Sequence, residues 1–170
     1  MLNIGPTVYL AGSINGHKSW ELVTTWRTYA EKMLEAAGYR VLNPVRGRSP
    51  TDADSKDIVE RDLQDIAKAD ILLVEMDHED KAYIGTAMEI RYAWERGKEI
   101  IIWGRANRES HWLKYHTHVR CNTLGQALEY LLKRKVRNEC FWCGGNMVPL
   151  PDESYICSEC GWRHKGMMQS

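Results

Sequence analysis

The chain has no excess of charge of either sign, since its 170 residues contain 23 Lys and Arg and 23 Asp and Glu. This balance argues against a protein that grips nucleic acid or a membrane surface through its overall charge. The sequence also lacks a secretory signal and an apolar run long enough to cross a bilayer. These absences predict a cytosolic protein. Its 44% hydrophobic content is enough for one globular core with a small appendage.

The five cysteines are not spaced as a disulfide framework. Four of the five cysteines form two C-x-x-C pairs, and Cys121 stands alone as an expected buried, inert thiol. In a reducing compartment such pairs are typical of metal ligands, although the 13-residue spacer is slightly shorter than usual. Four thiolates form a closed tetrahedral site, so the pattern predicts one structural Zn²⁺ in a C-terminal zinc ribbon. The predicted ligands are Cys140, Cys143, Cys157 and Cys160.

The rest of the chain alternates apolar strands with amphipathic helices. The expected strands are runs of apolar residues rather than alternating ones, which is typical of a parallel sheet covered by helices on both faces. The pattern predicts an α/β fold of the flavodoxin-like, doubly wound type. The expected strands are 7–11, 39–42, 70–76, 100–103 and 119–121, and the expected helices are 20–37, 58–67, a helix from about 85 to 97, and 124–133.

A basic stretch after the last helix marks the expected domain boundary. We expect residues 1–133 to form the α/β domain and residues 134–170 to form a basic linker and the zinc ribbon. So short a unit buries too little surface to fold without a staple such as a metal. The basic flanks could contact nucleic acid, but compensation of the negative tetrathiolate centre is the favoured interpretation.

Glu89 is the first candidate for chemistry. It follows an apolar strand and an acidic loop, and we expect it in or near the first turn of its helix. There, free backbone amides and the helix dipole would keep its carboxylate ionised. Since the carboxyl ends of parallel strands converge on one crevice, such an anion could attack an electrophilic carbon. Position alone is not decisive, because glutamate is also simply a good helix former.

Five blocks of sequence strengthen this interpretation. They are Val8-Tyr9-Leu10-Ala11-Gly12-Ser13-Ile14, Asn43-Pro44, Glu60-Arg61-Asp62-Leu63-x-x-Ile66, Ala69-Asp70, and Gly85-Thr86-Ala87-Met88-Glu89-Ile90-x-Tyr92-Ala93. In this order, over about residues 6–133, they resemble the nucleoside 2-deoxyribosyltransferase family. That superfamily also contains deoxynucleoside-monophosphate N-glycosidases.

The resemblance implies three catalytic residues and no catalytic cofactor. Glu89 matches the nucleophile that forms a covalent deoxyribosyl-enzyme, and Tyr9 matches the tyrosine that orients it. Asp62 matches the aspartate that contacts the base and helps its nitrogen take up a proton, although a solvated helix charge is the alternative in isolation. Cleavage of an N-glycosidic bond requires these two tasks, a carboxylate at the sugar and a proton for the base.

The expected substrate contacts lie around the same sheet edge. Gly12 and Ser13 match the wall around the sugar or its 5′ end. Many relatives carry Asp or Ser six residues before the nucleophile, whereas this chain has Tyr83, which leaves base and phosphate specificity open. Loop arginines could contact a phosphate, or they could simply be solvated. The complete expected set is Gly12, Ser13, Asn43, Arg46, Asp80, Tyr83 and Gly85.

The sequence thus predicts an enzyme that moves deoxyribose from a deoxynucleoside or deoxynucleotide to another nucleobase through Glu89. A deoxynucleoside 5′-monophosphate N-glycosidase is the alternative, since only the group that attacks the intermediate differs. Two further alternatives are a non-catalytic nucleotide sensor with a zinc ribbon and an NAD glycohydrolase. By analogy with the family, we expect a homo-oligomer, a dimer or larger.

Overall fold

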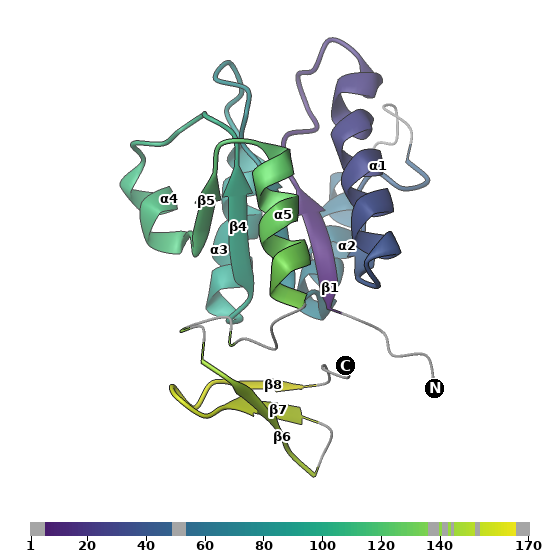
Figure 1. The fold of residues 1–170 in the computed structure, drawn as a ribbon. Coiled ribbons are helices and arrows are strands. Elements are labelled where there is room, and N and C mark those ends of the chain that lie inside the picture. Colours follow the sequence, from purple (N-terminus) through teal and green to yellow (C-terminus); the bar gives the residue numbers. More distant parts are fainter. Residues whose placement is uncertain are drawn as a thin grey trace.

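The computed structural model describes residues 6–48, 54–135, 140, 143, 145–151 and 154–165. A five-stranded parallel sheet in the order β2-β1-β3-β4-β5 forms its centre (Figure 1). This architecture confirms the predicted doubly wound α/β fold. The strands are β1 (Thr7–Ala11), β2 (Arg40–Leu42), β3 (Ile71–Glu75), β4 (Glu99–Trp103) and β5 (Val119–Cys121).

Helices cover both faces of the sheet, as the uninterrupted apolar strands require. Alternate residues of each strand point to opposite faces, so β1 sends Val8 toward one core and Tyr9 toward the other. One core contains α1 and α5, and the other contains α2, α3 and α4. The helices are α1 (Trp20–Ala36), α2 (Ser55–Lys68), α3 (Ile84–Glu95), α4 (His111–His116) and α5 (Leu124–Lys135).

Helix ends differ from the sequence expectations where polar caps extend an element. Helix α2 begins at Ser55 because the Asp54 side chain accepts a 2.9 Å hydrogen bond from the Lys56 amide. Helix α4 was not expected, and its start is capped by Ser110, whose hydroxyl accepts from the Leu113 amide at 3.4 Å. Apolar periodicity alone misses both features, because the residues at these starts are polar.

A second, antiparallel sheet follows with the strand order β6-β7-β8, formed by β6 (Met147–Pro149), β7 (Ser154–Cys157) and β8 (Arg163–Lys165). It is drawn in yellow-green in Figure 1. Most of the predicted linker, residues 136–139, lies outside the described residues. The division of the chain at residue 134 therefore stays a prediction. No helix among the described residues is long and apolar enough to cross a membrane.

Candidate active site

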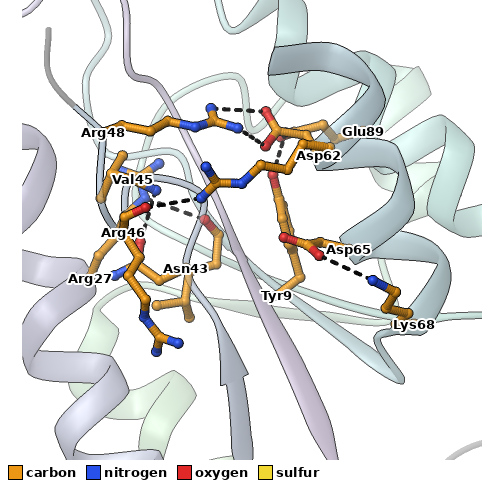
Figure 2. Close-up of polar contacts among 12 residues, drawn as sticks. Tyr9, Arg27, Asn43, Val45, Arg46, Arg48, Asp62, Asp65, Lys68 and Glu89 are labelled. Carbon is orange, nitrogen blue, oxygen red and sulfur yellow. Dashed lines mark hydrogen bonds and ion pairs between the residues drawn. The ribbon is translucent and has the colours of Figure 1, made fainter. Parts of the chain in front are cut away.

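The predicted catalytic side chains meet at the carboxyl edge of the sheet (Figure 2). Tyr9 comes from β1, Asp62 from α2 and Glu89 from α3. The Tyr9 hydroxyl donates a 2.9 Å hydrogen bond to Glu89 Oε1. Burial and the charge of Glu89 raise the pKa of Tyr9 well above its usual value. The phenol therefore keeps its proton and acts as a donor, as a residue that orients a carboxylate must.

The electrostatic expectation for Glu89 was wrong. Helix α3 begins at Ile84, and the Ala87 amide already bonds the Tyr83 carbonyl, so Glu89 lies in the second turn, beyond the free amides. Burial raises the pKa of Glu89 to about 7, opposed by the hydrogen bond from Tyr9. Glu89 is therefore divided between its acid and carboxylate forms near neutral pH, the range in which catalytic carboxyl groups often titrate.

Asp62 is not a solvated helix charge. Its side chain is 12% exposed, and Oδ1 accepts a 2.7 Å hydrogen bond from Arg48 Nη2 in an ion pair. Burial raises the pKa of Asp62, and the hydrogen bond and charge of Arg48 oppose that rise. The charge of Asp62 also contributes to the raised pKa of Glu89. The two carboxyl groups are therefore coupled parts of one site.

The arginine in this site is Arg48 rather than Arg46. Arg46 has a 57% exposed side chain and forms ion pairs with Glu31 and Glu35 of α1. The Arg48 side chain is only 9% exposed and reaches over the loop to Asp62, as Figure 2 shows. The sequence does not separate the two residues, because they lie two positions apart in one polar loop.

The turn after β1 is held against β3 by a buried carboxylate, Glu75. A Cβ on Gly12 would lie 2.9 Å from the Cβ of Glu75, so this close approach requires glycine. The Ser13 amide and hydroxyl lie 3.3 and 3.2 Å from Glu75 Oε2 and donate to it. The Ser13 hydroxyl also contacts His17 Nε2 at 2.6 Å. The amide and hydroxyl of Ser13 are therefore directed at the protein itself.

Glu75 also holds the residues that follow β3 and precede α3. Its Oε1 accepts 2.6 Å hydrogen bonds from the Tyr83 hydroxyl and the Asp77 amide. Tyr83 precedes α3 in a left-handed conformation with φ 51°, which this bond helps to hold. Sequence reasoning missed Glu75 as a site residue. The available signal was a glutamate ending the otherwise apolar strand 71–74.

Arg27 is a second residue that sequence reasoning missed. It is 0% exposed, and its guanidinium donates to the carbonyls of Leu10, Val23 and Gly12 at 3.3, 2.7 and 2.9 Å. Burial lowers the pKa of Arg27 to about 10. The signal was an arginine on the buried stripe of α1, between Val23 and Ala30. Arg27 ties α1 to the end of β1 that carries the turn.

The structure gives three other expected contact residues, Asn43, Asp80 and Gly85, different surroundings. Asn43 is buried, and it donates to Glu31 at 2.9 Å and accepts from the Val45 amide at 3.2 Å. Asp80 is exposed and pairs with Lys81 at 3.0 Å, which lowers its pKa. Gly85 lies at the start of α3 with open space where a Cβ would stand. Asn43 thus shapes the turn after β2, while Gly85 leaves room beside the site.

The four cysteines of the small sheet form a candidate metal centre. Their Sγ atoms all lie within 4.8 Å of one another. The Cys140–Cys160 and Cys143–Cys157 sulfurs are 3.6 and 3.4 Å apart. Tetrahedral coordination at a Zn–S distance of about 2.3 Å gives sulfur separations of about 3.8 Å. The arrangement fits a metal ion such as zinc.

Comparison with known proteins places this site in a family. The profile described as "Nucleoside 2-deoxyribosyltransferase like" matches residues 5–105. The chain belongs to this family. Family and fold together support deoxyribosyltransferase or N-glycosidase chemistry in general. No curated protein matches the chain.

Solved structures with the same fold include two transferases and a glycosidase. A 2-deoxyribosyltransferase of Leishmania mexicana is 16% identical with TM-score 0.60, over 75% of this chain and 97% of that chain. The enzyme of Bacillus psychrosaccharolyticus is 19% identical with TM-score 0.57, over 73% and 91%. A CMP N-glycosidase of Clostridium botulinum is 20% identical with TM-score 0.52, over 74% and 97%. At 16–20% identity, the similarity to these three structures shows a shared fold.

Proposed function

We propose that this protein cleaves the N-glycosidic bond of 2′-deoxynucleosides or deoxynucleotides and transfers the deoxyribose to another nucleobase. The observation that carries the proposal is the bond from Tyr9 to Glu89 beside the buried Asp62. A carboxyl group with a pKa of about 7 supplies a nucleophile near neutral pH, and its neighbour supplies a proton.

In the proposed reaction each of these groups has one task. A Glu89 carboxylate oxygen forms a bond to C1′ as the bond from C1′ to the base nitrogen breaks. The electron pair of that bond goes to the base, which takes a proton from the acid form of Asp62. Tyr9 holds the attacking carboxylate through its hydroxyl. A second base then attacks C1′, gives the proton of its attacking nitrogen to the Asp62 carboxylate and releases Glu89, so one covalent intermediate serves the transfer.

Hydrolysis of deoxynucleoside 5′-monophosphates is the second candidate, because water could attack the same intermediate. Its specific support is the likeness to the CMP N-glycosidase, which shares the fold over 97% of its length. Incubation with deoxynucleosides and their monophosphates, with and without a free acceptor base, separates the two. We expect exchange of bases. Release of base from monophosphates alone would support the hydrolase, and cleavage of no substrate would contradict both candidates.

We also propose that the four cysteines hold one structural Zn²⁺, with no metal needed for catalysis. Four thiolates are soft ligands suited to zinc, and a closed site leaves no position for a substrate. Elemental analysis of freshly purified protein should find one zinc per chain, lost in Cys140→Ser, with base exchange retained. Absence of zinc from the purified protein would contradict this proposal.

A homo-oligomer in the cytosol completes the proposal. Its support in the structure is that α3 and α4, which pack against each other, each carry two large apolar side chains that are 68–74% exposed. Large exposed apolar side chains in one region are typical of interaction surfaces. The side chains are Ile84, Met88, Trp112 and Tyr115. Light scattering should give the mass of a dimer or larger assembly, whereas a monomer at micromolar concentration would contradict this part.

A further inference from the structure

Arg48 and Asp62 form a nearly buried ion pair, and under the proposed function the leaving base contacts Asp62 at this point. Arg48 Nη2 lies 2.7 Å from Asp62 Oδ1, and Nη1 lies 3.5 Å from Oδ2. The two side chains are 9% and 12% exposed, so each covers the other (Figure 2). Both carboxylate oxygens therefore face the arginine. A base that contacts Asp62 has to displace or share this guanidinium.

We propose that Arg48 reads the leaving base: it moves off Asp62 as the base enters and donates to the acceptor beside the atom that Asp62 protonates. The inference rests on the proposed function, because it requires Asp62 to face the base. Arg48 is close enough for this contact, since any atom within hydrogen-bond distance of Asp62 lies next to the guanidinium of Arg48. One edge of the base must therefore satisfy both residues.

The hydrogen-bond donors of Arg48 and Asp62 determine which bases can bind here. A guanidinium only donates, and the acid form of Asp62 donates its one proton. The matching edge needs two neighbouring acceptors, such as N7 and O6 of a 6-oxopurine, the pair that arginine reads in nucleic acids. Adenine instead presents an amino group beside N7, which would face the arginine donor to donor. We therefore expect a preference for hypoxanthine over adenine, two bases of nearly the same shape.

The proton balance of the step agrees with this movement. In the free protein Arg48 favours the charged form of Asp62. Once Arg48 has moved to O6, Asp62 can take a proton from water and give it to N7 as the bond from C1′ to N9 breaks. Glu89 receives C1′, and the carboxylate of Asp62 can pair with Arg48 again after the base leaves. The other charged or titratable groups that act on Asp62 or are affected by its charge are Arg61, Asp65, Tyr9, Arg27 and Glu89.

The test compares kcat/KM for deoxyinosine and deoxyadenosine with a common acceptor base. In the unmutated protein we expect deoxyinosine to be preferred by about tenfold or more, because adenine would leave a donor of Arg48 without an acceptor. Arg48→Ala should bring the ratio near one. Arg48→Lys should restore the charge beside Asp62 but only part of the ratio, because lysine lacks the planar fork. Arg61→Ala removes a positive charge next to Asp62 on α2 and should leave the ratio unchanged.

The free protein gives a second readout that does not depend on turnover. The carboxyl carbon signal of Asp62 in NMR should titrate at higher pH in Arg48→Ala than in the unmutated protein, and Lys should restore most of the difference. A merely structural ion pair would move this titration in the same way but would leave the base ratio unchanged, so the titration tests the ion pair and the base ratio tests the contact of Arg48 with the base. If the unmutated protein and Arg48→Ala both turn over the two nucleosides and give the same ratio of kcat/KM, the inference about Arg48 is overturned. Turnover of no substrate by the unmutated protein contradicts the proposed function itself.

Discussion

Two glutamates at the same edge of the sheet lie in contrasting surroundings. Glu75 is 1% exposed and accepts hydrogen bonds from two amides and two hydroxyls. Glu89 is partly exposed as a residue, but its carboxyl group is buried, and among the described residues that group receives a hydrogen bond from Tyr9 alone. Both side chains leave water, but only Glu75 regains a full set of donors.

The difference separates a structural carboxylate from a reactive one. Donors that surround a carboxylate stabilise its charge and occupy its lone pairs, so it cannot attack a carbon. Glu89 keeps lone pairs free, and burial without enough donors raises its pKa to about 7. We therefore expect changes at Glu75 to act on stability and changes at Glu89 to act on catalysis.

The largest expected effect is on catalysis at Glu89. Glu89→Ala should lower kcat by at least about a thousandfold, as loss of a nucleophile does, with the fold retained. Glu95→Gln is the matched control, because Glu95 lies on the same helix, half exposed and paired with Arg91. Base release or exchange measured by chromatography gives the rates. If the activity of Glu89→Ala lies within tenfold of that of the unmutated protein, Glu89 is not the reactive carboxylate.

Glu75 should give the largest loss of stability. Glu75→Ala leaves the Ser13 amide, the Asp77 amide and the Tyr83 hydroxyl without their buried acceptor, at a cost of about 2–4 kcal/mol in the free energy of unfolding. Urea denaturation measures this value. The exposed Glu79 provides a control, since Glu79→Ala should change stability by less than about 0.5 kcal/mol. Equal stability of the two variants would contradict a structural role for Glu75.

Tyr9→Phe should have an intermediate effect that depends on pH. The lost hydroxyl favoured the carboxylate of Glu89, so its removal raises the pKa of Glu89 further. At pH 7 we expect kcat/KM to fall by about ten- to a hundredfold. The rise of kcat/KM with pH, which follows ionisation of Glu89 near pH 7 in the unmutated protein, should move to higher pH. A uniform loss at every pH would show that Tyr9 does not act through Glu89.

The smallest effect is a gain of stability in Glu89→Gln. A carboxyl group with a raised pKa holds its proton in the folded state while the unfolded chain has already lost it. The unmutated protein should therefore lose stability between about pH 4.5 and about pH 7, relative to the variant. Above pH 8 the variant should be more stable by up to about 3 kcal/mol, the free energy that corresponds to a pKa raised from 4.5 to about 7. A stability difference that does not change with pH would contradict the raised pKa.

The sequence predicts the fold well because its signals are local. The apolar runs of β3 and β4 and the stop at Gly97, which has φ 65°, appear in the structure as expected. The sequence also indicates Tyr9, Asp62 and Glu89, which the structure brings to one edge of the sheet. Their roles in the reaction stay predictions.

The remaining features depend on contacts between distant segments. Arg46 and Arg48 lie in one loop but pair with carboxylates of different helices. Arg46 pairs with Glu31 of α1, and Arg48 pairs with Asp62 of α2. The roles of Glu75 and Arg27 depend on groups of other elements, such as the turn at Ser13 and the end of β1. The pKa of Glu89 depends on burial, which a helix pattern does not measure.

The most direct measurement of the central claim is the capture of the covalent intermediate. A deoxynucleoside with fluorine on C2′ should slow release of the sugar from Glu89, since fluorine destabilises the positive charge that develops at C1′. Mass spectrometry of the quenched protein, followed by peptide mapping, should find the sugar on Glu89 and no adduct in Glu89→Gln. Release of base without any sugar adduct, or an adduct on another residue, would contradict the account.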